Sequence, residues 1–248
     1  MKNYKKNFNL LKKNHVYSEE MEHDACGVGL IASTEGKKTR AVVEYGIEAL
    51  KAVWHRGAVD ADGKTGDGAG IHLEIPSDFF SEKIEITGHK HDGSEICVGM
   101  IFLPRNNYEA QENARTLIES ELTKSNFSIY GWRQVPVNPK VLGEKANLTR
   151  PEITQVLFKH NDKNLIGKNL ERKIYESRRK IEKEAIKSSI DGFYICSLSS
   201  KSIIYKGMFL AESIGDFYVD LKDERFVSRF VIFHQRFSTN TAPSWDLA

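Results

Sequence analysis

Cys26-Gly-Val-Gly-Leu-Ile-Ala32 is the stretch that decides the fold. Its small and branched apolar residues predict a buried strand. The residues before it are polar, basic over 1–15 and then rich in Glu, His and Asp. Cys26 therefore starts a core strand, a position typical of a buried structural cysteine. His23 lies three residues earlier, but the base of a cysteine nucleophile is usually supplied from elsewhere in the fold.

Downstream of this strand, the spacing of apolar residues is that of short strands in most segments and that of helices in a few. Helical spacing of apolar residues predicts helices over 41–54, 108–122 and 170–187. Strands are predicted over 71–75, 96–103, 129–137, 153–159, 193–198, 202–205 and 230–237. Because the helices interrupt a series of strands without regular alternation, we expect a layered α+β domain.

Composition excludes several classes of protein. The chain has 248 residues, 40% of them hydrophobic, and a net charge of +2, so we expect neither a nucleic-acid nor a membrane partner. Residues 1–15 lack the apolar centre of a secretory signal and the arginine and serine of a transit peptide. Cys26, Cys97 and Cys196 are far apart and odd in number, which predicts no metal site, no disulfide framework and a cytoplasmic location.

The glycine-rich stretch HRGAVDADGKTGDGAG, residues 55–70, invites two ligand-binding interpretations. A phosphate-binding loop needs four residues before its Gly-Lys-Thr, whereas five separate Gly57 from Gly63. A calcium loop would begin with Asp60 and Asp62, but Lys64 occupies the next ligand position. Both interpretations are therefore disfavoured, and a solvated turn is the simple alternative.

Three strings in this order resemble one family. They are HDACGVGLIAS, HRGAVDADGKTGDGAGIHLEIP and FHQRFSTNTAPSWDLA, and they are similar to the class II glutamine amidotransferase domain of the glutamate synthase family. The resemblance extends over residues 20–248. It implies an N-terminal-nucleophile hydrolase fold, a four-layer α/β/β/α sandwich. It also implies a leader or propeptide at 1–25 and an amidotransferase domain at 26–248, truncated at its C-terminus.

The resemblance assigns roles to residues that composition leaves undecided. Cys26 would become the first residue of the mature chain and act as the nucleophile, with its own α-amino group as the base. Arg236 would bind the α-carboxylate of glutamine, and Thr239 and Asn240 would line the same pocket. Without the resemblance, an arginine at a strand end followed by polar residues predicts only a surface charge and a turn. His72, Cys97 and Cys196 are interpreted as packing residues.

The activity implied is hydrolysis of L-glutamine, with ammonia passed to 2-oxoglutarate and reduced to glutamate. We expect no cofactor in this chain, whereas the parent enzyme would use FMN and an iron–sulfur cluster. Its partners would be the remaining synthase domains and a small subunit. The sequence contains no His-Asn-Gly string to supply the oxyanion hole expected in this family. A truncated, inert folding or interaction module is therefore an alternative, as is an amidotransferase with another acceptor.

Overall fold

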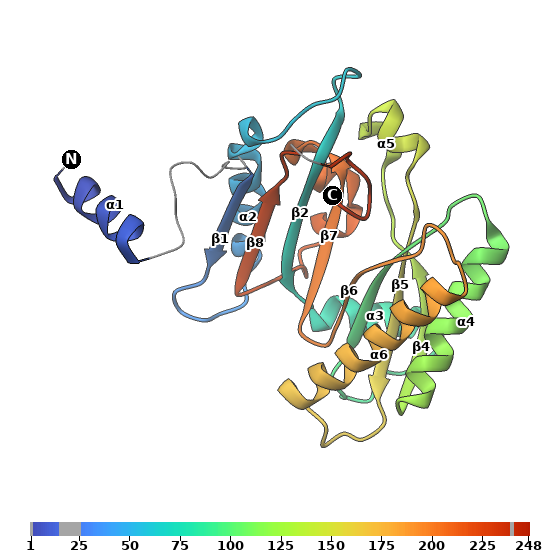
Figure 1. Cartoon of the computed structure of the whole chain (residues 1–248). Helices are drawn as coiled ribbons and strands as arrows, with labels where there is room; N and C mark the ends of the chain where they lie inside the picture. The colour runs from blue at the N-terminus through green and yellow to red at the C-terminus, as the bar shows by residue number, and fades with distance from the viewer. Residues whose placement is uncertain (1, 15–25, 239–240) are drawn as a thin grey trace.

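Two antiparallel sheets form the centre of the computed structural model, which describes residues 2–14, 26–238 and 241–248 (Figure 1). Each sheet has four strands. The first sheet has the order β1 (Gly27–Ala32), β8 (Phe230–Gln235), β2 (Thr65–Glu74) and β7 (Ser202–Phe209). The second has the order β4 (Phe127–Gln134), β5 (Glu152–His160), β3 (Cys97–Leu103) and β6 (Tyr194–Ser199).

Helices flank these sheets. They are α2 (Arg40–Ala52), α3 (Ser77–Ile86), α4 (Tyr108–Lys124), α5 (Glu144–Leu148), α6 (Gly167–Lys187) and α7 (Ile214–Phe217). A further helix, α1 (Lys2–Asn14), lies apart from the sheets in Figure 1. The helix α2 begins after Thr39, whose hydroxyl accepts the N–H of Val42 at 3.3 Å. It lies against β1 and β8 and buries Val43 and Leu50 there (Figure 1). No helix in the described part of the chain is long and apolar enough to cross a membrane.

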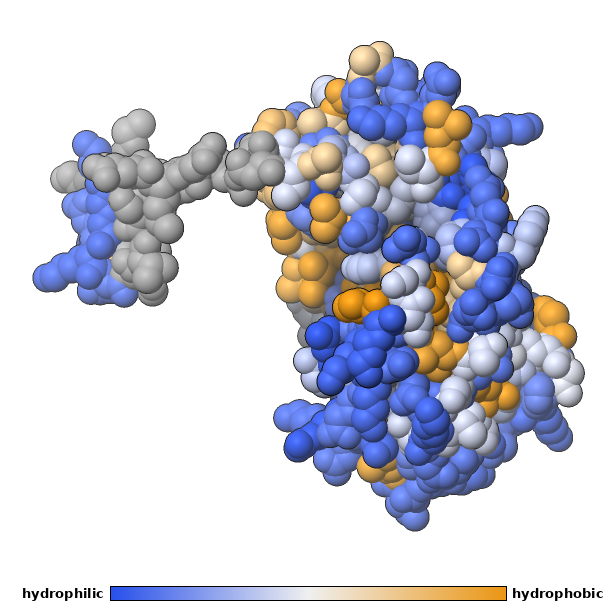
Figure 2. Space-filling view, turned by 45° about the vertical axis from the view of Figure 1, so that its right-hand side comes forward, coloured by the Kyte–Doolittle hydropathy of each residue, from blue (hydrophilic) through white to orange (hydrophobic). Residues whose placement is uncertain are grey.

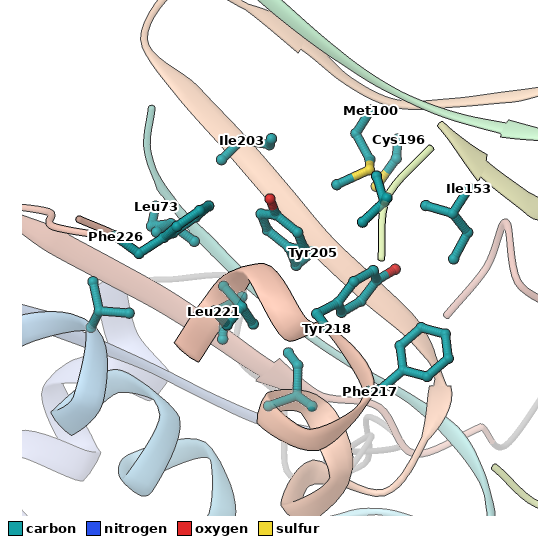
Figure 3. Close-up of a cluster of buried hydrophobic side chains, with 14 of the residues drawn as sticks. Leu73, Met100, Ile153, Cys196, Ile203, Tyr205, Phe217, Tyr218, Leu221 and Phe226 are labelled. Carbon is teal, nitrogen blue, oxygen red and sulfur yellow. The ribbon is translucent and has the colours of Figure 1, made fainter. Parts of the chain in front are cut away.

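Two hydrophobic cores follow from this arrangement. The larger core joins α2 and the first sheet to the inner face of the second sheet. Figure 3 shows part of it, where side chains from β7 and from residues 217–226 lie near Met100 and Ile153 of the second sheet. The smaller core lies between the other face of the second sheet and helices α4 and α6. Two sheets with flanking helices confirm the predicted α+β class and agree with the four-layer sandwich.

A buried polar cluster crosses the larger core. The Arg133 guanidinium donates to both carboxylate oxygens of Asp220 at 2.8 and 2.9 Å, and to the side-chain oxygen of Gln155 at 2.7 Å. The Tyr205 hydroxyl donates to Asp220 at 3.1 Å and accepts from Gln155 at 3.2 Å. Burial raises the pKa of Tyr205 well above its usual value, so this hydroxyl stays protonated. The cluster ties the second sheet to β7 and to the segment that carries Asp220.

The strand β1 is an edge strand, and the prediction that it is buried is wrong. Among the residues that the structure describes, it pairs with β8 alone, and its residues alternate between the α2 side and solvent. Val28 and Leu30 are 66% and 60% exposed, and Ile232 beside them on β8 is 40% exposed. An apolar sequence cannot by itself distinguish a central strand from an edge strand with one open face. Elsewhere, the surface in Figure 2 is mostly hydrophilic, with hydrophobic residues in separate patches.

The glycine-rich stretch contributes more regular structure than its composition predicts. β2 begins at Thr65, six residues before the predicted strand at 71. Its register shifts between Thr65 and Ala69, and Gly68 has φ +141°. A side chain is strained at that φ, so glycine allows the strand to continue through the irregularity.

The structure differs from the predicted elements at two further places. The strand β7 extends to Phe209, beyond the predicted end at 205, and the helix α3 was not predicted.

Candidate active site

Cys26 immediately precedes β1 at the end of the first sheet. Gly27 pairs with Gln235 across the sheet, so Cys26 lies opposite the residues that follow β8. The Cys26 Sγ accepts the backbone N–H of Phe237 at 3.4 Å and lies 3.8 Å from the Phe237 carbonyl oxygen. The side chain is only partly buried. A thiol in contact with solvent and with a backbone donor is placed for chemistry, unlike a sealed core cysteine.

Arg236 lies directly across from Cys26 when the β1–β8 register is continued by one residue. Its backbone N–H donates to the Gly68 oxygen at 2.8 Å, and its Nη1 donates to the Asp67 oxygen at 3.3 Å. Its Nη2 donates to the Thr241 hydroxyl. A guanidinium has five N–H donors, so these two side-chain contacts leave donors for a ligand. Opposed residues in a sheet point to the same face, so a register continued from Gly27 and Gln235 puts the Cys26 and Arg236 side chains on one face of the first sheet.

Two further predicted pocket residues, Thr239 and Asn240, lie outside the residues that the structure describes. Their assignment therefore stays a prediction. The neighbouring Ser238 is described, and its hydroxyl is buried without a hydrogen-bond partner in the described part of the chain. Sequence alone left the role of this serine undecided.

Asp67 shapes the segment that carries Arg236. Its carboxylate accepts the backbone N–H of Ser238, and its backbone oxygen accepts from the Arg236 guanidinium. Contacts on both sides of Phe237 hold these residues against β2. In the structure, Asp67 therefore positions the segment that follows β8. His55 and Arg56 lie on the exposed 3-10 turn Trp54–Arg56.

The acidic residues of the glycine-rich stretch are engaged in local structure. The Asp62 carboxylate accepts the N–H of Thr65 at 2.7 Å and its hydroxyl at 2.6 Å, and these contacts hold the Asp62 pKa well below its usual value. Asp60 pairs with Lys145 at 2.7 Å. No group of three or more metal-binding side chains occurs within the described ranges. The calcium-loop interpretation therefore gains no support.

The other two cysteines are sealed. Cys97 and Cys196 are 0% and 4% exposed. Burial raises the pKa of Cys97 well above its usual value and that of Cys196 to about 12. Both lie in strands, as the sequence indicates. His72 is a half-buried residue of β2 whose ring stands edge-on to Phe230, and burial lowers its pKa.

With this geometry established, comparison with known proteins identifies the family. Residues 26–248 match the family model described as class-II glutamine amidotransferases. The chain therefore belongs to the class-II glutamine amidotransferases, and the recognition made from its motifs is confirmed.

The similar proteins are glutamate synthases. The NADPH glutamate synthase large chain of Azospirillum brasilense is 56% identical over 234 residues, covering 94% of this chain and 15% of that protein. Ferredoxin-dependent glutamate synthase 2 of Synechocystis is 40% identical over 228 residues, covering 92% of this chain and 14% of that protein. The NADPH glutamate synthase large chain of Bacillus subtilis is 40% identical over 241 residues, covering 96% and 15%. The chain thus spans about 15% of the length of these relatives.

Proposed function

We propose that this chain hydrolyses glutamine with Cys26 and forms the ammonia-producing part of a glutamate synthase. The observation that carries the proposal is the partly exposed Cys26 thiol opposite Arg236 at one end of the first sheet. The family match, which begins at Cys26, supports the same assignment.

The reaction would use two groups of Cys26, its thiol and its α-amino group. The Cys26 sulfur attacks the side-chain amide carbon of glutamine, and the Cys26 α-amino group takes the thiol proton and delivers it to the departing nitrogen. Ammonia leaves, and water hydrolyses the thioester to glutamate. A free α-amino group titrates near pH ~7.7–8.0, so it serves as a base near neutrality. With residues 1–25 attached, the same nitrogen is an amide and cannot act so, which makes these residues a propeptide.

The later steps belong to other parts of the parent enzyme. Ammonia would pass to 2-oxoglutarate and be reduced there, in domains that bind FMN and an iron–sulfur cluster. The described residues do not fit such a cluster, because Cys97 and Cys196 are buried in different cores and no metal-binding group forms. The remaining synthase domains and a small subunit are the proposed partners, and the cytoplasm is the proposed location.

Removal of the leader tests the proposal. We expect ammonia release from glutamine only after residues 1–25 are removed, since only then is the Cys26 nitrogen a free amine. The measurement is a glutaminase assay of this chain and of the full-length synthase, with intact mass recording the first residue. Equal hydrolysis by protein that still begins at Met1 would contradict the propeptide role. Absence of both turnover and trapping of Cys26 by a reactive glutamine analogue would favour the inert module.

Arg236→Lys is expected to raise the KM for glutamine about 10- to 100-fold, with a smaller effect on kcat. Lysine keeps the charge but loses the planar fork that holds a carboxylate, and a hydrogen bond between charged groups contributes about 1.5–3 kcal/mol. Arg229→Lys is the matched control, because Arg229 pairs with Glu74 away from Cys26. An unchanged KM in Arg236→Lys would remove this residue from the glutamine site.

A further inference from the structure

The peptide that joins Arg236 to Phe237 is held at both of its polar ends. Its N–H, from Phe237, points to the Cys26 sulfur at 3.4 Å. Its carbonyl oxygen, from Arg236, accepts the side-chain Nε2 of Gln235 at 3.4 Å. The same Nε2 donates to the Gly68 oxygen at 3.2 Å. One buried carboxamide thus fixes the peptide whose other side faces the nucleophile.

Gln235 is kept in this place at a cost in stability. It is 1% exposed, and its Oε1 is buried without a hydrogen-bond partner in the described part of the chain. An unsatisfied buried acceptor destabilises the folded state, and an apolar side chain of similar shape would avoid that cost. Stability alone therefore does not explain a glutamine at the end of the otherwise buried face of β8, and a role at the neighbouring site does.

Gly57 supplies the space for this carboxamide. A Cβ atom at position 57 would lie 2.1 Å from the Gln235 Nε2 and 2.6 Å from its Cδ. No side chain fits at that distance, so any other residue at 57 would displace Gln235. The turn that ends the 3-10 segment Trp54–Arg56 is in this way coupled to the end of β8.

We propose that Gln235 is a positioning residue for the nucleophile: it orients the Arg236–Phe237 peptide so that the Phe237 N–H reaches the Cys26 sulfur. The thiolate is the reactive form of cysteine, and an N–H donor to sulfur favours that charged form. Glutamine binding does not depend on this contact, because the Arg236 guanidinium is held by Asp67 and Thr241. The role for Gln235 rests on the proposed function of Cys26.

Gln235→Met tests the inference, since methionine keeps the length of the side chain and removes the donor. In the leader-free full-length synthase, we expect kcat for glutamine hydrolysis to fall about tenfold with KM within about twofold, the size of effect expected when a contact to a charged group is weakened. In the 248-residue chain, alkylation of Cys26 by iodoacetamide at one neutral pH should slow several-fold. Gln111→Met is the matched control, because Gln111 is also buried and donates to two backbone oxygens, those of Pro104 and Arg105.

Gly57→Ala is the second variant, which retains Gln235 and displaces its carboxamide. We expect the same fall in kcat and in alkylation rate, and this variant decides the question where Gln235→Met does not fold. Unchanged kcat and unchanged alkylation in a folded variant would overturn the inference. A rise in KM equal to the fall in kcat/KM would also overturn it, since that result indicates a binding role. Alkylation needs no glutamine turnover, so failure of the proposed function is seen separately, as absence of hydrolysis in the unaltered enzyme.

Discussion

Cys26→Ser is expected to lower the rate of glutamine hydrolysis by about 10³-fold or more, the scale seen when a nucleophile is removed. Serine nearly matches cysteine in size and leaves the Phe237 N–H in place. However, a hydroxyl is much less ionised than a thiol near neutral pH and is a poorer nucleophile. The measurement is ammonia release by the leader-free enzyme at saturating glutamine.

Controls for this substitution come from the sealed cysteines. Cys196→Ala removes a thiol that is 4% exposed in the larger core, and the folded variant should retain hydrolysis. Cys26→Ser should unfold at the same denaturant concentration as the unaltered chain, because the side chain is partly exposed. A Cys26→Ser enzyme that keeps a tenth of the activity or more would show that another residue is the nucleophile.

Asp220→Ala is expected to reduce the free energy of unfolding by about 3–5 kcal/mol, because it leaves the buried Arg133 guanidinium without its carboxylate. The ion pair is bidentate, with Arg133 and Asp220 side chains only 14% and 3% exposed. The Tyr205 hydroxyl would lose its acceptor as well. Urea unfolding followed by tryptophan fluorescence measures the change.

The control is a nearby ion pair at the surface. Asp216 pairs with Lys222 at 2.8 Å, and the two side chains are 62% and 59% exposed. Asp216→Ala should therefore change the free energy of unfolding by no more than about 1 kcal/mol. If Asp220→Ala were equally mild, the buried cluster would not be what joins the second sheet to the Asp220 segment.

Local patterns predicted most of the strands and the longer helices because their periodicity is encoded residue by residue. The strand at 153–159 and the helix at 108–122 are found with small extensions, as β5 and α4. The open face of β1 was not predictable in this way. Its exposure depends on pairing with β8 alone, at the other end of the chain, and no local pattern in residues 26–32 reports that.

The site shows the same division. The family motifs predicted roles for Cys26 and Arg236. In the structure, Gly27 pairs with Gln235, and Cys26 contacts Phe237, the residue after Arg236. The motifs did not indicate Gln235 or the Phe237 N–H, because backbone contacts leave no signal in side-chain type. One signal was present: a glutamine that follows the apolar run FVIF with one residue between. A polar side chain at a core-facing strand position is usually held there by a specific partner.

The contact between Cys26 and Phe237 joins residues 211 positions apart in sequence. During synthesis the N-terminal residues emerge first. The strand β1 therefore cannot pair with β8 until residues 230–235 have left the ribosome. The end of the first sheet that carries Cys26 is consequently among the last parts of this chain to assemble, since contacts so distant in sequence form slowly. Cys26 therefore meets the Phe237 N–H only when nearly all of the 248 residues have been made, and the hydrolysis proposed for it could begin only then.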